Sequence, residues 1–285
     1  MNDVLIIGAK GQLGSDLSKS FESAIKWDIE DINICDFDKT REMIKHVAPR
    51  IVINTAAYHN VKECEKNPLV AFKVNTVAVD NLAKICRNID ATLVHFSTDY
   101  VFDGKKSSPY IESDHPNPLN FYGLSKYAGE IAVANSCKRY YIFRLASLFG
   151  AAGPRGKGGN FIETMIKKAS NNEKIEVVTD VVMSPTYTKD VAHFLTNFIG
   201  KNYPFGIYHL TNSGFCSWYQ FTLEIFRKFG LEIQVESVSY KDLGQNVPRP
   251  KYSVLVSNRL PKLGLEPLRP WTDALNDYLK EKKYI

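Results

Sequence analysis

Short apolar runs alternate with polar, helix-like stretches through the first half of the chain. Strands are predicted at 4–7, 24–29, 50–54, 92–96 and 140–144, because each run is rich in β-branched or other apolar residues and ends near a turn signal. Helices are predicted after 38–40, over 71–87 and over about 122–135. Strands that alternate with helices in this way favour a parallel sheet with helices on both faces.

This alternation becomes less regular after residue 148. Residues 150–159 form a glycine-rich, basic loop, and several proline-containing segments follow it. We therefore predict an α/β protein with a doubly wound parallel sheet (a Rossmann fold) and a smaller α/β substrate domain. The NAD(P)-binding Rossmann domain is expected at 1–148. Residues 149–285 would be mainly substrate domain, with some segments returning to the Rossmann sheet.

Composition and charge narrow the class of protein. The 285 residues are 44% hydrophobic and 24% charged, which is close to average for soluble globular proteins and argues against a disordered or fibrous chain. The net charge of +5 is scattered rather than gathered into a basic stripe, so no nucleic-acid partner is expected. No apolar run approaches the length of a membrane span. We expect a cytoplasmic protein without a membrane partner.

The cysteines give no sign of a metal or disulfide framework. None of the five forms a C-x-x-C pair or has a histidine at zinc spacing. Free thiols in a reducing compartment are the simplest interpretation, and no metal is expected. The five are Cys35, Cys64, Cys86, Cys137 and Cys216.

A glycine pattern lies where the first predicted strand must turn into a helix. Gly8, Gly11 and Gly14 are spaced as G-x-x-G-x-x-G, which lets the backbone approach a pyrophosphate at a helix N-terminus. Asp28 follows Gly8 by twenty residues, at the end of the second strand, where a carboxylate can bind adenosine ribose hydroxyls. Glycines in any strand-to-helix turn could give the same pattern, and Asp28 alone could equally be a solvated acid.

Tyr122 and Lys126 form a sharper signal, because residues four apart share one face of a helix. A lysine ammonium beside a tyrosine stabilises the phenolate and lowers the tyrosine pKa toward neutrality. Such pairs also occur by chance on solvated helices. Thr98 favours the catalytic interpretation, since it directly follows a predicted strand, and the carboxyl ends of strands form the ligand crevice of a doubly wound sheet.

Two stretches around these residues closely resemble one enzyme family. S-T-D-Y-V-F-D-G (97–104) and N-F-Y-G-L-S-K-Y-A-G-E (120–130) are similar to bacterial dTDP-4-dehydrorhamnose reductases, which are extended short-chain dehydrogenase/reductases. Shorter segments at 8–14, 54–57, 159–161, 184–186, 217–219 and 249–255 resemble the same family in order. The resemblance implies an NAD(P)H-dependent oxidoreductase of nucleotide-sugar and polysaccharide biosynthesis. It would reduce the 4-keto group of dTDP-4-dehydro-6-deoxy-L-mannose (dTDP-4-dehydrorhamnose) to dTDP-L-rhamnose.

The resemblance also implies roles for individual residues. Thr98, Tyr122 and Lys126 match the catalytic triad, with Tyr122 donating a proton to the substrate O4 as hydride reaches C4. Tyr122 and Lys126 would also contact the cofactor. The remaining implied cofactor contacts are Gly8, Gly11, Gln12, Leu13, Gly14, Asp28, Asp36, Phe37, Ala56, Ala57, Tyr58 and Asn75. The implied substrate contacts are Asp99, Ser147, Asn160 and Arg249.

Arg249 would bind a pyrophosphate oxygen, a task that suits a guanidinium, although a surface arginine is the alternative. The chain also departs from the family. Ser147 stands where relatives have a tryptophan near the sugar, Lys62 replaces a usual aspartate, and Lys189 falls where some relatives have an acid that shares a metal across a dimer. These departures leave the sugar open, and they leave open whether the protein is a monomer or a homodimer.

Two alternatives remain at this stage. The substrate could be another 4-keto-6-deoxyhexose nucleotide, for instance one giving the talose epimer. The chain could also be a non-catalytic cofactor-binding regulatory subunit, although the intact triad favours an enzyme. Of NADH and NADPH, NADH is favoured, because Asp28 would repel a 2′-phosphate and residues 29–31 supply no cation.

Overall fold

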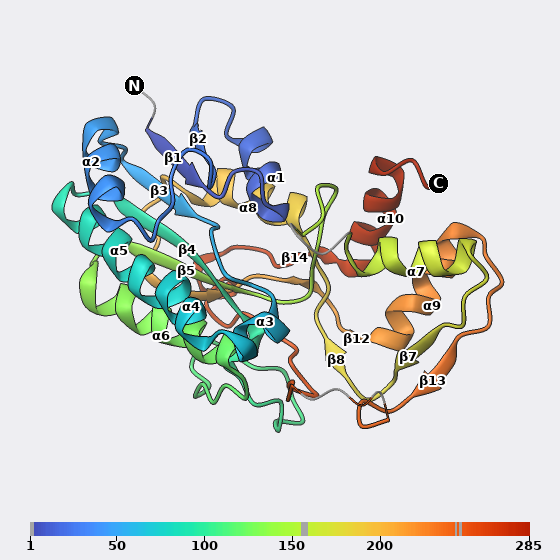
Figure 1. Ribbon diagram of the computed structural model, residues 1–285. Coiled ribbons are helices and arrows are strands. Elements are labelled where there is room, and N and C mark those ends of the chain that lie inside the picture. The colour runs from blue at the N-terminus through green and yellow to red at the C-terminus, as the bar shows by residue number, and fades with distance from the viewer. Residues whose placement is uncertain (1–2, 155–158, 243, 245–246) are drawn as a thin grey trace.

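A six-stranded parallel sheet forms the centre of the molecule (Figure 1). The computed structural model describes residues 3–154, 159–242, 244 and 247–285. The strand order is β10-β5-β4-β3-β1-β2, in which the chain winds outward in both directions from β1 and β3. The predicted doubly wound α/β fold is therefore confirmed. The strands are β1 (Val4–Ile7), β2 (Ile25–Trp27), β3 (Ile51–Asn54), β4 (Thr92–Thr98), β5 (Tyr140–Leu145) and β10 (Gly206–His209).

Helices cover both faces of this sheet (Figure 1). On one face lie α1 (Gln12–Ser20) and α8 (Thr188–Phe198), and on the other lie α2 (Phe37–Val47), α5 (Ala78–Asn88) and α6 (Phe121–Ser136). Consecutive residues of a strand point to opposite faces, so Ile6 packs in the core with α1 and α8 while Leu5 and Ile7 pack in the other. Burial on both faces explains why the strands read as continuous apolar runs.

The second half of the chain builds a separate apolar core around three helices, α7 (Phe161–Ser170), α9 (Trp218–Phe229) and α10 (Trp271–Glu281). Two elements of this half, α8 and β10, lie with the large sheet instead. The division at residue 148 stays a prediction, and part of the expected boundary loop, 155–158, lies outside the described residues. The short strands pair as β6 (Leu148–Phe149) with β9 (Thr186–Tyr187), β7 (Glu176–Val178) with β13 (Glu236–Val238), β8 (Val182–Met183) with β12 (Cys216–Ser217), and β11 (Asn212–Ser213) with β14 (Leu268–Pro270).

Helix boundaries differ from the sequence-based expectation at two places. The helix expected after residues 38–40 begins earlier, at Phe37, because the Asp36 side chain accepts a hydrogen bond from Lys39 N and caps it. The helix expected over 71–87 is interrupted by a π-helical turn, η1 (Lys73–Val77), between α4 (Pro68–Phe72) and α5. The shorter segments are α3 (Val61–Lys66) and the 3₁₀ turns η2 (Asp99–Val101) and η3 (Pro261–Leu263).

Helix α6 approaches its neighbours unusually closely. A β-carbon at Gly123 would lie 2.1 Å from the carbonyl oxygen of Tyr100, and one at Gly129 would lie 2.3 Å from that of Asn75. A buried ion pair joins the helix to β5, with Arg144 Nε 2.9 Å from Glu130 Oε1 and Nη2 2.7 Å from Oε2. These contacts fix the position of the helix that carries the predicted proton donor.

None of the helices in the described part of the chain has the length and apolar character needed to cross a membrane. The five cysteines are all free thiols; Cys35 is half-buried and the other four are buried.

Candidate active site

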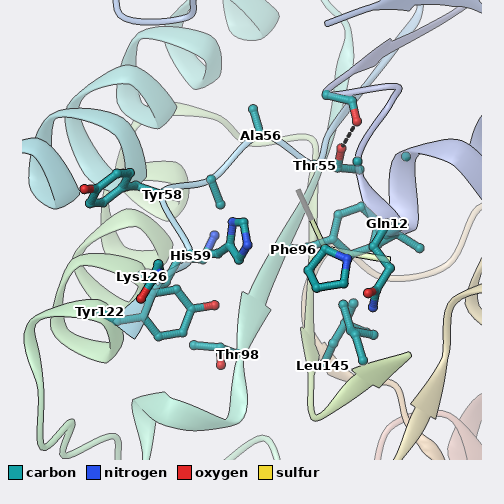
Figure 2. Close-up of a pocket in the computed structure, with 18 of the residues that line it drawn as sticks. Gln12, Thr55, Ala56, Tyr58, His59, Phe96, Thr98, Tyr122, Lys126 and Leu145 are labelled. Carbon is teal, nitrogen blue, oxygen red and sulfur yellow. Dashed lines mark hydrogen bonds between the residues drawn. The ribbon is translucent and has the colours of Figure 1, made fainter. Parts of the chain in front are cut away.

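A cavity of about 980 Å³ opens at the carboxyl ends of the sheet strands, where it is bounded by both halves of the chain. Ligands of doubly wound folds bind at this edge. Sixteen of the predicted site residues line it, and Figure 2 shows several of them. They are Gly8, Gly11, Gln12, Leu13, Gly14, Asp28, Ala56, Ala57, Tyr58, Thr98, Asp99, Tyr122, Lys126, Ser147, Asn160 and Arg249.

The turn between β1 and α1 leaves no room for a side chain at Gly8 or Gly14. Gly8 has a φ of +82°, and a β-carbon there would lie 2.6 Å from Thr55 Oγ1, while one at Gly14 would lie 2.0 Å from the carbonyl oxygen of Gly8. Helix α1 starts here without a side-chain cap. Gln12 Oε1 is buried with no hydrogen-bond partner in the described structure. Free amides at a helix N-terminus together with this open cradle fit a pyrophosphate.

Asp28 lines the cavity close to the glycine turn. Its Oδ2 accepts a hydrogen bond from Lys10 N at 2.7 Å and its Oδ1 accepts one from Ile29 N at 2.8 Å. The Lys10 ammonium pairs with Glu30 at 3.2 Å. From the sequence we expect no cation among residues 29–31, which follow Asp28. That expectation considered only the residues following Asp28, whereas the glycine turn brings Lys10 beside it.

Three predicted cofactor contacts do not line the cavity. Asp36 caps α2 and Phe37 packs against the core beneath that helix. Asn75 is fully buried in the π turn, where its amide bonds the backbone of Tyr58 and the hydroxyl of Ser125. Asn75 thus shapes the cavity wall through Tyr58. The cavity edge expected near 36–37 is formed by residues 32–35 instead.

The predicted triad is brought together on one side of the cavity. Figure 2 shows the Tyr122 hydroxyl directed toward Thr98. Lys126 lies on the same helix as Tyr122, and Gln12 and Leu145 lie on the opposite side of the cavity. Thr98 Oγ1 donates to Asp99 Oδ1 at 3.0 Å and accepts from Tyr100 N at 3.2 Å. Burial raises the pKa of Tyr122, and hydrogen bonding with the Thr98 side chain opposes that rise. The tyrosine is therefore a phenol, ready to donate.

Lys126 departs from the sequence-based expectation. We expect its ammonium to lower the pKa of Tyr122, but burial raises that pKa, and the lysine Nζ lies 3.3 Å from His95 Nε2. Lys126 is only 3% exposed, and this burial lowers its own pKa to about 8, against an opposing effect of Glu130. Near neutrality the lysine can both hold and release a proton.

Asp99 and Arg249 both line the cavity, and each has a buried polar atom without a partner among the described residues. Asp99 Oδ2 and Arg249 Nε are buried without a hydrogen-bond partner in the described structure. Burial raises the pKa of Asp99 to about 6, and hydrogen bonds with Ser253 and Thr98 oppose the shift. Buried polar atoms of this kind usually find a partner, so both positions suit a polar substrate.

Asn160 and Ser147 behave differently. Asn160 lines the cavity, but its side chain caps α7 and donates to Gly150 O and to the Tyr278 hydroxyl, so its polar atoms are already engaged. Ser147 has a φ of +43° and faces the cavity. An aromatic wall stands at this end all the same, because Phe161 and Trp218 both line the cavity with ring centroids 4.5 Å apart.

Sequence reasoning gave no site role to Trp218 or Tyr100, which also line the cavity. Both residues lie in segments that resemble the reductase family, and this resemblance could have pointed to them as site residues. Trp218 follows Ser217, whose side chain caps α9, so the cap directs the first residue of that helix to the cavity edge.

Comparison with known proteins identifies the lineage. The family model described as the RmlD substrate binding domain matches residues 1–284. The chain belongs to the RmlD family. It is thus a member of a family of NAD(P)-dependent sugar-nucleotide oxidoreductases, as the resemblance implied.

Individual relatives are similar to this chain over nearly its whole length. The chain is 39% identical to the spore coat polysaccharide biosynthesis protein SpsK of Bacillus subtilis over 286 residues, covering 99% of this chain and 98% of SpsK. It is 36% identical to a dTDP-4-dehydrorhamnose reductase of Streptomyces griseus, covering 96% and 91%. The structure of dTDP-4-dehydrorhamnose reductase from Bacillus anthracis in complex with NADP has a TM-score of 0.93, at 34% identity and coverage of 99% and 100%.

Lys189 stands at the position where the resemblance implied a metal-sharing acid in some relatives. Lys189 Nζ lies 3.8 Å from Glu281 Oε2, so the lysine ammonium sits beside a carboxylate. Within the described residues, no group of three histidine, cysteine or acidic side chains is arranged to hold a metal ion.

Proposed function

We propose that this RmlD-family protein reduces the 4-keto group of dTDP-4-dehydrorhamnose to give dTDP-L-rhamnose. The observation that carries the proposal is the group of Thr98, Tyr122 and Lys126 on one side of a cavity that also contains a pyrophosphate cradle. The full-length similarity to named dTDP-4-dehydrorhamnose reductases supports this substrate.

The side chains divide the work as follows. The glycine turn would hold the pyrophosphate of a nicotinamide cofactor, and that cofactor would supply the hydride that the carbonyl carbon receives. Tyr122, kept as a phenol by its burial, donates a proton to the oxygen of that carbonyl. Thr98 holds the Tyr122 hydroxyl in place. Arg249, with its unsatisfied Nε, binds the diphosphate of the sugar nucleotide.

Two observations allow a different sugar as substrate. Ser147 stands where relatives have a tryptophan, and the similar SpsK is named for spore coat polysaccharide biosynthesis. A second candidate is therefore reduction of another 4-keto-6-deoxyhexose nucleotide. The test supplies purified protein with NADH or NADPH and each keto-sugar nucleotide, then follows absorbance of the reduced cofactor and identifies the product epimer. No oxidation with any 4-keto-sugar would contradict the enzyme function and favour a regulatory subunit.

Ser147 is expected to set how strictly the sugar is selected. A serine leaves the cavity wider and wetter than a tryptophan would, and a buried aromatic contact is worth about 1–3 kcal/mol. Ser147→Trp should therefore sharpen discrimination between two 4-keto-sugar nucleotides, measured as the ratio of their kcat/KM values. An unchanged ratio would show that the side chain at 147 does not meet the sugar. Ser23→Trp, at an exposed position outside the cavity lining, is the control.

The preference for NADH that the sequence favoured is not supported, since the B. anthracis relative is in complex with NADP. We propose that Lys10 allows NADPH binding by pairing with the 2′-phosphate beside Asp28. An exposed ion pair is worth about 0.2–1 kcal/mol, so Lys10→Met should weaken NADPH binding up to about 5-fold and leave NADH unchanged. Dissociation constants measured by fluorescence check this.

Lys26→Met is the matched control, because the Lys26 ammonium bonds the carbonyl of Glu22 and the charge lost is the same. Equal losses of affinity for both cofactors in Lys10→Met would exclude a contact with the 2′-phosphate.

A further inference from the structure

Two buried polar residues stand behind Lys126, outside the lining of the cavity. His95 comes from β4 and Asn54 from β3, and they are 0% and 1% exposed. The Lys126 Nζ lies 3.3 Å from His95 Nε2, and His95 Nδ1 lies 3.2 Å from Asn54 Nδ2. A chain of three polar groups thus runs from the predicted triad into the interior of the sheet.

The backbone determines which way the Asn54 amide faces. Ala56 N lies 3.1 Å from Asn54 Oδ1, and a main-chain N–H can only donate. The oxygen of the amide therefore accepts from Ala56, and the NH₂ group faces His95. The opposite orientation would place two donors against each other.

This orientation selects one tautomer of His95. Burial lowers the pKa of His95 far below its ordinary value, and the Lys126 charge lowers it further, so the ring is neutral. Because Asn54 donates to Nδ1, the single ring proton is on Nε2. That N–H faces the Nζ of Lys126. An ammonium only donates, so the contact is satisfied when Lys126 is a neutral amine that accepts from His95.

We propose that Asn54 and His95 are positioning residues that weaken the hold of Lys126 on its proton. The functional meaning rests on the proposed reductase. Once Tyr122 has given its proton to the substrate oxygen, the phenolate must be reprotonated. Lys126, one turn along the same helix face, breaks an N–H bond as the phenol O–H re-forms, and the amine that remains accepts a hydrogen bond from His95 until it takes up H⁺ from bulk solvent.

The other titratable groups on the surrounding elements do not account for such a weakening. Glu130, also on α6, raises the pKa of Lys126, and its carboxylate is bonded to Arg144 of β5. Tyr122 lies on the same helix, while Cys64 of α3 and Asp99 of η2 lie toward Tyr122. A negative charge on any of these would favour the ammonium. Burial and the His95 N–H act in the opposite direction.

The proposal is tested by titrating Lys126 itself in the intact protein without ligand. Lysine labelled with ¹³C at Cε is followed by NMR from pH 6 to 11, and the Lys126 signal is assigned by its loss in Lys126→Met. In Asn54→Asp, the new carboxylate accepts from both Ala56 N and His95 Nδ1. The ring proton then moves to Nδ1, and Nε2 becomes an acceptor for the ammonium. The Lys126 pKa should rise by about one pH unit, as expected for one hydrogen bond.

A second variant guards against misfolding of the first. His95→Gln can turn its amide oxygen toward Lys126 and should raise the lysine pKa similarly. Asn81→Asp adds the same charge on α5, where the Asn81 amide bonds the Phe37 carbonyl, and should leave Lys126 unchanged. A wild-type Lys126 that titrates near 10.4, or one whose pKa is the same in Asn54→Asp, His95→Gln and wild type, would overturn the proposal.

The titration does not depend on turnover, so its failure is distinct from failure of the proposed reductase. If the keto-sugar assay succeeds, the basic limb of the kcat profile should move to higher pH in both variants, in step with the Lys126 pKa. A purely structural role of His95 would lower the melting temperature without moving that limb.

Discussion

Replacing Tyr122 with phenylalanine is expected to lower kcat by about 10²–10⁴-fold, the usual contribution of a general acid. The ring contacts survive, including the edge-on contact with Tyr100 at 5.9 Å between centroids, whereas the transferable proton is lost. Cofactor affinity should stay close to wild type. The measurement is single-turnover oxidation of NADPH by the keto-sugar nucleotide, together with a fluorescence titration of the cofactor.

Tyr127→Phe provides the matched control. Tyr127 lies on the same helix, but it packs against the small core around Phe102 and is not part of the cavity lining. It should keep nearly full activity. If Tyr122→Phe retained half of the wild-type turnover, another group would have to be the acid, and the mechanism would be wrong.

The second large effect concerns stability. Glu130→Leu should destabilise the protein by about 3–5 kcal/mol, because it leaves the Arg144 guanidinium in the interior without its carboxylate. Both side chains are 2% exposed, and an arginine cannot escape the cost by losing its proton. His209 lies 3.4 Å from Arg144 Nη1 and the Phe102 ring centroid lies 5.1 Å from Arg144 Cζ, and neither group carries a compensating negative charge. Urea unfolding followed by circular dichroism measures the change.

Glu63→Leu removes a carboxylate from an exposed pair with Lys66 and should cost at most about 1 kcal/mol. Adding Arg144→Met to Glu130→Leu removes the stranded charge and should restore part of the stability. If Glu130→Leu cost no more than Glu63→Leu, the buried pair would contribute little to folding.

Much of the fold could be predicted because its signals are local. The strands at Val4–Ile7 and Ile51–Asn54 are buried on both faces, so they stand out as apolar runs, and the predicted starts and ends lie within one residue of those in the structure. The Tyr122 helix was also found within one residue, since Asn120 caps it and the apolar pattern continues. The π turn before α5 was not foreseen, because helical periodicity hardly changes across one turn.

Site residues could be predicted where a local sequence motif sets the backbone conformation. They were harder to predict where segments far apart in the sequence come together. The glycine turn and Thr98 follow from strand ends. Asp36, by contrast, serves its own helix as a cap, a role that its sequence position alone does not separate from cofactor binding. Similarly, Lys10 reaches Asp28 only because β1 and β2 are neighbours in the sheet. The environment of Lys126 depends on β3 and β4, far from it in sequence.

The closeness of α6 to the main chain at Gly123 and Gly129 has a consequence for how this lineage diversifies. A backbone carbonyl occupies the place where a β-carbon would stand at each position, so any substitution there shifts the whole helix and the proton donor with it. Ser147, Phe161 and Trp218, by contrast, belong to the lining of the cavity. Single exchanges of those side chains would therefore change the proposed sugar pocket while the proposed proton donor stays in place.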